Sequence, residues 1–169
     1  PAEKEAFFAC EPAGQLEMFF RCWTQKKAYV KALAVPAKTA QEGARMIAER
    51  LDSHPRVTSV YYPGLAGQDP RGLVGRQMAG PGSILAFEVA GGIDAASRVL
   101  GAVQLMVSAV SLGSTDTLIQ HPAGLTHHCV DEEARASTGI SESLLRISVG
   151  LEDPEDLWAD LEAALETAG

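Results

Sequence analysis

Residues 110–150 read VSLGSTDTLIQHPAGLTHHCVDEEARASTGISESLLRISVG, and this stretch decides the fold. Short apolar strands are expected near its two ends, with a middle rich in Gly, Thr, His and Pro between them. Successive side chains of a strand point to opposite faces, so Leu145 and Ile147 share one face and Arg146 lies on the other. A guanidinium is costly to bury unless an anion or a hydrogen-bonding group receives it. Arg146 is therefore a candidate receptor for a carboxylate.

Two interpretations of Arg146 remain open at the level of sequence. In the first, the planar guanidinium fork makes a bidentate contact with a ligand carboxylate, which it matches better than a lysine would. In the second, Arg146 lies on an edge strand and pairs with a local acid such as Glu142 or Glu152. The pattern alone does not separate a binding role from a structural one.

Length, composition and charge limit the class of protein to which the chain can belong. The chain has 169 residues, of which 46% are hydrophobic and 21% charged, as expected of one soluble globular domain with a real core. The net charge of -8 and the pI near 4.9 argue against a nucleic-acid surface. No run approaches the roughly 18 apolar residues of a membrane span, and the first residues lack the features of a signal peptide. Three cysteines without CxxC spacing favour a reducing, cytoplasmic compartment.

A metal site is considered and not favoured. Three histidines and a cysteine, namely His121, His127, His128 and Cys129, follow one another closely. Their spacing does not match a structural zinc pattern, and no second cysteine pair completes four ligands. A loop that hydrogen-bonds to its own backbone is the preferred interpretation.

Hydrophobic periodicity and turn residues predict the elements. Strands are expected at 57–62, 84–89, 104–113 and 144–149, and helices at 39–51, 69–78, 94–100, 114–119, 131–137 and 154–165. Thr39 with Glu42 makes a capping box for the first helix, and Asp153 caps the last. Together these elements predict an α/β (α+β) layer, in which helices cover one face of a small, mainly antiparallel sheet of about four strands.

Four long motifs occur in order along the chain: YYPGL (61–65), RQMAGPGSILAFEVAGG (76–92), AVSLGSTDTLIQHPAGLTHH (109–128) and GISESLLRISVGLEDPEDLWADLEAAL (139–165). Taken together, they closely resemble the C-terminal domain of the Cys/Met-metabolism family of pyridoxal-phosphate-dependent enzymes. The likeness runs from about Thr39 to Ala168. It implies the fold of the C-terminal domain of fold-type I transferases, with pyridoxal 5'-phosphate as the cofactor of the intact enzyme.

The resemblance also implies roles for individual residues. Arg146, in LLRISVG, matches the arginine that binds the α-carboxylate of the substrate. Ser111, in VSLG, matches a serine that lies against the same carboxylate, and Thr126, in LTH, matches a threonine that lines the pocket. It places no catalytic residue, cofactor ligand or metal ligand in this chain.

The family's cofactor groups are not matched. Pyridoxal chemistry needs a lysine for the imine linkage, an acid on the pyridine nitrogen and groups for the phosphate. In the family these come from a larger N-terminal domain, whereas all five lysines of this chain fall at or before Lys38. The resemblance therefore implies that 1–36 is a degenerate remnant of the inter-domain region, that 37–169 is the C-terminal substrate-carboxylate domain, and that the large cofactor-binding domain is absent.

The function implied is that of the C-terminal part of a sulfur amino-acid enzyme of the trans-sulfuration type, with γ-elimination on methionine, cystathionine or homocysteine. Val110 is apolar where the cystathionine enzymes carry a glutamate, which looks more like the methionine γ-lyases. The alternatives are a truncated, non-catalytic module that needs a separate cofactor-bearing chain or, within the family, a cystathionine γ-synthase or O-acetylhomoserine sulfhydrylase. The chain alone is expected to be inactive. The partners implied are a small amino acid and, in the intact enzyme, copies of itself in a tetramer, with no nucleic acid and no membrane.

Overall fold

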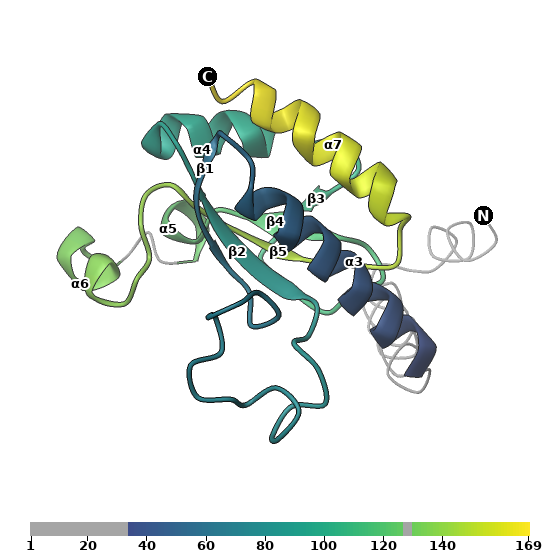
Figure 1. Cartoon of the computed structure of the whole chain (residues 1–169). Helices are drawn as coiled ribbons and strands as arrows, with labels where there is room; N and C mark the ends of the chain where they lie inside the picture. The colour runs from purple at the N-terminus through teal and green to yellow at the C-terminus, as the bar shows by residue number, and fades with distance from the viewer. Residues whose placement is uncertain (1–33, 127–129) are drawn as a thin grey trace, which may run out of the picture. The chain divides into compact units, whose positions relative to one another are not determined.

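The computed structural model describes residues 34–126 and 130–169, and Lys38–Gly169 form one compact unit (Figure 1). The strands are β1 (Val57–Tyr61), β2 (Ile84–Val89), β3 (Val107–Ser108), β4 (Leu118–Gln120) and β5 (Leu144–Ser148). The helices are α3 (Ala34–Asp52), α4 (Gly92–Ala102), α5 (Pro122–Leu125), α6 (Glu132–Ser137) and α7 (Pro154–Glu166). Most of the segment interpreted as an inter-domain remnant, 1–36, lies outside the described residues, so the proposed domain boundary stays a prediction.

The strands form one five-stranded sheet in the order β1-β2-β5-β4-β3. Neighbouring strands are antiparallel except β3 and β4, which run parallel. The predicted fold class is confirmed, with one strand more than expected and one parallel pair. Because parallel neighbours run in the same direction, the chain between them must return to the end of the sheet where it started. Residues 109–117 make this return, and they hold part of the candidate site.

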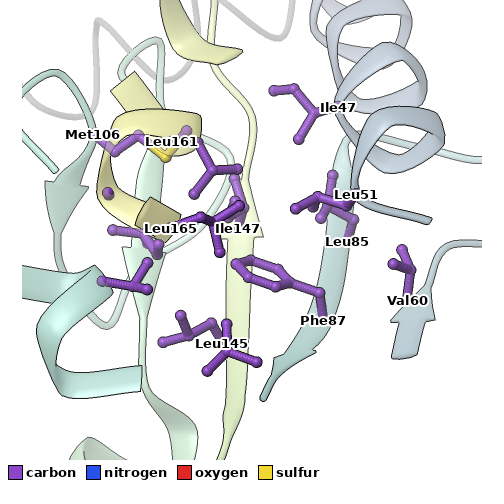
Figure 2. Close-up of a cluster of buried hydrophobic side chains, with 14 of the residues drawn as sticks. Ile47, Leu51, Val60, Leu85, Phe87, Met106, Leu145, Ile147, Leu161 and Leu165 are labelled. Atoms are coloured by element: carbon purple, nitrogen blue, oxygen red, sulfur yellow. The ribbon is translucent and has the colours of Figure 1, made fainter. Parts of the chain in front are cut away.

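One face of the sheet carries the core. Leu85, Ile147 and Ile119 lie opposite one another on three adjacent strands and are almost completely buried. Side chains from α3, such as Ile47, and from α7, such as Leu161, cover this face, as Figure 2 shows. The prediction that helices cover one face of the sheet is confirmed. The other face carries both apolar residues, such as Leu118 and Leu144, and the polar Arg146, Gln120 and Ser148.

The last helix forms as its sequence predicts. The Asp153 carboxylate accepts a hydrogen bond from the backbone N–H of Glu155 at 2.8 Å, and Pro154 occupies the first turn. Leu157, Leu161 and Leu165 recur at helical spacing and are fully buried. The strand at 84–89 and the helices around 94–100 and 131–137 are also confirmed. The described helices include none that is both long enough and apolar enough to cross a membrane.

The start of the first helix was predicted wrongly. Thr39 is not its N-cap, because α3 begins five residues earlier at Ala34 and continues through Pro36. Proline is tolerated in the first turn of a helix, where its missing N–H has no helical partner. Pro36 therefore does not interrupt the helix.

The predicted helix at 69–78 is absent, and this segment consists of turns. The Asp69 carboxylate accepts hydrogen bonds from the N–H groups of Leu73 and Val74, at 2.9 and 2.8 Å. Gly72 and Gly75 adopt positive φ angles, which a helix does not allow. A local side-chain interaction and two glycines thus replace the helix.

Two predictions around the return loop were also wrong. The predicted helix at 114–119 ends instead in β4, because Leu118 and Ile119 pair with Ser148 and Ile147 of β5. Tertiary pairing overrides local preference here. The predicted strand at 104–113 is reduced to β3, an edge strand whose Val107 is half exposed. The four-residue helix α5 was not predicted.

Candidate functional site

Arg146 lies in the middle of the sheet on the face opposite to the core. Its strand, β5, is the central strand, and Arg146 is paired in register with Ala86 of β2 and Gln120 of β4. Residues directly opposite in a sheet share a face. Leu145 and Ile147 are fully buried in the core. The prediction that Arg146 lies on the opposite face of the strand from these two residues is therefore confirmed.

The guanidinium of Arg146 has only part of its hydrogen-bonding capacity satisfied. Its Nη2 donates to the backbone carbonyl oxygen of Ser111 at 2.9 Å. Its Nε is buried and has no hydrogen-bond partner. Burial lowers the pKa of Arg146, because desolvation disfavours the charged form and no anion opposes that effect. The site therefore presents a partly desolvated cation that has no counter-ion among the residues the structure describes.

The structural alternative for Arg146 is wrong. Glu142 forms an ion pair with Arg135 instead. Glu152 accepts hydrogen bonds from the N–H and the hydroxyl of Thr117, at 2.6 and 2.7 Å. Neither acid is paired with Arg146, and the strand that carries Arg146 is central rather than at the edge.

The return loop, residues 109–117, is hydrogen-bonded to the strand that carries Arg146. Ser148, two residues beyond Arg146 on β5, accepts a hydrogen bond from the N–H of Gly113 at 2.9 Å. Gly113 has a φ angle of 71°, a conformation that favours glycine. The structure thus brings Ser111 to Arg146, through the backbone carbonyl of Ser111. The Ser111 side chain is exposed beside it.

Thr126 lies at the end of α5, a short helix that packs against β5. Its backbone N–H and its hydroxyl both donate to the carbonyl oxygen of Pro122, at 3.2 and 3.3 Å. His121, just before α5, forms a 2.9 Å hydrogen bond between its Nε2 and the backbone oxygen of Glu142. These contacts hold the helix beside the strand of Arg146, and a role for Thr126 in the pocket remains a prediction.

Gln120 is the polar residue of the site that the sequence did not reveal. It is 2% exposed and lies directly across from Arg146, and its Oε1 has no hydrogen-bond partner. The available signal was strand alternation, which places Leu118 and Gln120 on one face and Ile119 on the other. That signal was lost because 114–119 was predicted as a helix.

The histidine-rich loop is described only in part. The imidazole of His121 is engaged by the backbone of Glu142, whereas His127, His128 and Cys129 lie outside the described residues. Within the part of the chain that the structure describes, no three His, Cys, Asp or Glu side chains come together as a metal site would require.

The face of the sheet that carries Arg146 suits a carboxylate but not the linkage of a pyridoxal cofactor. Its cation, Arg146, is an arginine, which cannot form an imine with an aldehyde. No lysine occurs after Lys38. Residues 39–169 therefore contain no side chain that could form the imine linkage, whereas Arg146 offers N–H donors to an anion.

Comparisons with known proteins show which family and which enzymes this chain resembles. A family model described as Cys/Met metabolism PLP-dependent enzyme matches residues 2–166. An L-methionine gamma-lyase from Brevibacterium aurantiacum is 53% identical over 139 residues, which are 82% of this chain and 33% of that protein. A second L-methionine gamma-lyase, from Porphyromonas gingivalis, is 45% identical over 138 residues, which are 82% of this chain and 35% of that protein.

Solved structures agree with this placement. A cystathionine gamma lyase from Micromonospora echinospora superposes with a TM-score of 0.74 at 42% identity, over 79% of this chain and 35% of that one. A cystathionine gamma synthase from Xanthomonas oryzae pv. oryzae, solved in complex with aminoacrylate and cysteine, gives a TM-score of 0.75 at 43% identity over the same shares. The chain spans about a third of the length of these relatives.

Proposed function

Since the chain belongs to the Cys/Met metabolism family of pyridoxal-phosphate-dependent enzymes, we propose that it holds the α-carboxylate of a sulfur amino acid. In this proposal it is the substrate-carboxylate part of an enzyme that removes the sulfur group by γ-elimination, with methionine, cystathionine or homocysteine as the substrate. The pyridoxal cofactor and its lysine are supplied from outside residues 39–169.

The observation that carries the proposal is the state of Arg146. Within the described part of the chain, this side chain has a buried Nε without a partner and one hydrogen bond, to the Ser111 carbonyl. A carboxylate would supply the missing counter-charge, and a guanidinium can receive it through two parallel N–H groups. In such a complex Arg146 binds the carboxylate and Ser111 lies beside it. Ser148 holds the loop in place by accepting a hydrogen bond from Gly113.

Fixing the carboxylate has a chemical consequence. A substrate that is held at this end has its Cα in a defined position, so that the reacting bond can be oriented by the rest of the enzyme. Orientation of this kind can supply a large part of a rate enhancement. The contribution of this chain is therefore positioning, and no proton transfer is assigned to its described residues.

The preference for elimination on methionine rests on Val110 and on the relatives. Val110 is 60% exposed and directly precedes Ser111, so it offers an apolar surface next to the carboxylate site. Two relatives that match over most of this chain are called L-methionine gamma-lyases. A γ-replacement reaction is the nearest competitor, because a superposable structure is a cystathionine gamma synthase.

The test is to replace Arg146 in the full-length protein that contains this chain. Arg146→Ala is expected to lower kcat/KM for L-methionine by about 100-fold, through a higher KM and a lower kcat, since a charge-assisted contact of roughly 2.7 kcal/mol that also positions Cα is lost. Arg146→Lys keeps the positive charge but loses the planar guanidinium, so its kcat/KM should lie between those of the parent and Arg146→Ala. Arg45→Ala is the matched control, because Arg45 makes an exposed pair with Glu49 within α3. Unchanged kinetics in Arg146→Ala would refute the assignment.

A second candidate is a non-catalytic module that works with a separate cofactor-bearing chain. The lack of lysine after Lys38 and the exposed apolar side chains of Val110 and Leu112 favour it. The purified chain is mixed with pyridoxal phosphate, reduced with borohydride and digested for mass spectrometry. A stoichiometric cofactor adduct on one lysine would contradict this candidate, whereas activity that appears only after a cofactor-bearing chain is added would support it.

A further inference from the structure

We propose that Gln120 is a positioning residue for Arg146, with its Oε1 accepting a hydrogen bond from the Nε–H of Arg146. This contact fixes the plane of the guanidinium and turns its two Nη groups toward the carboxylate. The inference rests on the proposed function, because the role it gives to Gln120 acts through Arg146 on the bound amino acid.

The first observation is the register of the sheet. Gln120 of β4 and Arg146 of β5 are directly opposite across an antiparallel pair. Side chains in this relation lie on one face, with Cβ atoms roughly 4.5–5.5 Å apart. Both side chains are long enough to meet at that spacing, and rotation about the broad terminal torsion of the glutamine can bring the amide to the guanidinium.

The second observation is a complementary pair of unsatisfied atoms. Within the described residues, three buried side-chain atoms lack a hydrogen-bond partner: Gln120 Oε1, Arg146 Nε and Arg135 Nε. The first is an acceptor and the second a donor, and they belong to the two opposed residues. Buried polar groups are almost always hydrogen-bonded, because leaving them unsatisfied is costly. Pairing Oε1 with Nε–H satisfies both at once.

The third observation concerns the donors that remain. A guanidinium has one N–H on Nε and two on each Nη. The Ser111 carbonyl takes one donor of Nη2. With Nε–H given to Gln120, three Nη donors are left. One N–H from each Nη group is enough for a carboxylate to accept two parallel bonds.

The kinetic test uses the full-length protein that contains this chain, with L-methionine as the probe. Gln120→Leu removes the acceptor at similar volume and is expected to raise KM about tenfold while kcat stays within about twofold, because binding alone is weakened. Gln120→Glu keeps an acceptor but places a negative charge beside the guanidinium, so KM should rise above that of Gln120→Leu. In an Arg146→Lys background, Gln120→Leu should add nothing, since lysine has no Nε–H. A KM unchanged by Gln120→Leu, or raised equally in both backgrounds, overturns the proposal.

A second measurement does not depend on turnover. With ¹⁵N-labelled arginine, the Nε–H of Arg146 should exchange with solvent about tenfold faster in Gln120→Leu than in the parent, a factor equivalent to 1.4 kcal/mol, and Gln120→Glu should restore the slow rate. Equal exchange in parent and Gln120→Leu overturns the pairing. If the parent cleaves no sulfur amino acid, the proposed function fails, and the exchange rates still decide whether Gln120 holds Arg146.

Discussion

Arg146 combines features that a purely structural arginine rarely shows. It lies on a central strand, its Nε is buried without a partner, and Glu142 and Glu152 are engaged elsewhere. Stability alone does not account for this arrangement, because a partly desolvated cation with no counter-ion among the described residues weakens the fold. The proposed binding of a carboxylate would account for it.

Glu152 shows the opposite case, an acid whose role is structural. Its two carboxylate oxygens accept from the N–H and hydroxyl of Thr117, which is completely buried and also receives the N–H of Gly150 at 2.9 Å. Glu152→Ala leaves two buried donors unsatisfied, so the free energy of unfolding in urea should fall by about 1–3 kcal/mol. Glu162→Ala, at an exposed position of α7, should change it by less than about 0.5 kcal/mol. Equal effects of the two substitutions would show that the Thr117 contacts carry no stability.

At the scale of elements, the loop at 69–78 is held by one carboxylate. Hydrogen bonds from the N–H groups of Leu73 and Val74 lower the pKa of Asp69 below its ordinary value of 3.8. A lowered pKa means that the contact is present above the unfolded value and is lost as the pH falls through the folded one. The loop should therefore open only under strongly acidic conditions.

This pH dependence can be measured directly. The amide chemical shifts of Leu73 and Val74 should titrate together with a midpoint below 3.8. Asp69→Asn keeps a side-chain oxygen but removes the titration, so its shifts should stay flat over the same range. A midpoint at or above 3.8 in the parent would contradict the hydrogen bonds described for this loop.

Elements with strong local signals could be predicted from the sequence. The strand at 84–89 is bounded by glycines, and α7 begins with a capping Asp153 and Pro154, so local chemistry was sufficient. The three-residue strand β4 has no such signal and exists because Leu118 and Ile119 pair with β5. The turns at 69–78 depend on a side-chain contact between residues four and five apart, which periodicity does not report.

Part of the candidate site could also be predicted from the sequence. Arg146 and its neighbour Ser111 came from strand alternation and from the family's motifs, and the structure brings them together. Finding Gln120 requires the register between β4 and β5. That register could not be predicted, because the sequence carries no strong local signal for β4. The place of Thr126 relative to the ligand remains a prediction.

At the scale of the whole molecule, the core belongs to one continuous part of the chain. Among the described residues, every member of the main apolar cluster lies between Ala44 and Ala168. A protein that begins at Ala34, the first residue of α3, should therefore unfold cooperatively in urea. Phe87→Ala in that protein should lower the free energy of unfolding by about 3–5 kcal/mol, because Phe87 is fully buried. A broad, non-cooperative transition would show that residues 1–33 are needed for the core.

The central claim is that Arg146 binds the substrate carboxylate, and the most direct test removes each partner in turn. In the full-length protein, kcat/KM is measured for L-methionine and for L-methioninamide, which lacks the carboxylate, with the parent and with Arg146→Ala. We expect the parent to prefer L-methionine by about 100-fold and the variant to show almost no preference, since the two changes remove the same contact. The same preference in parent and variant would contradict the account.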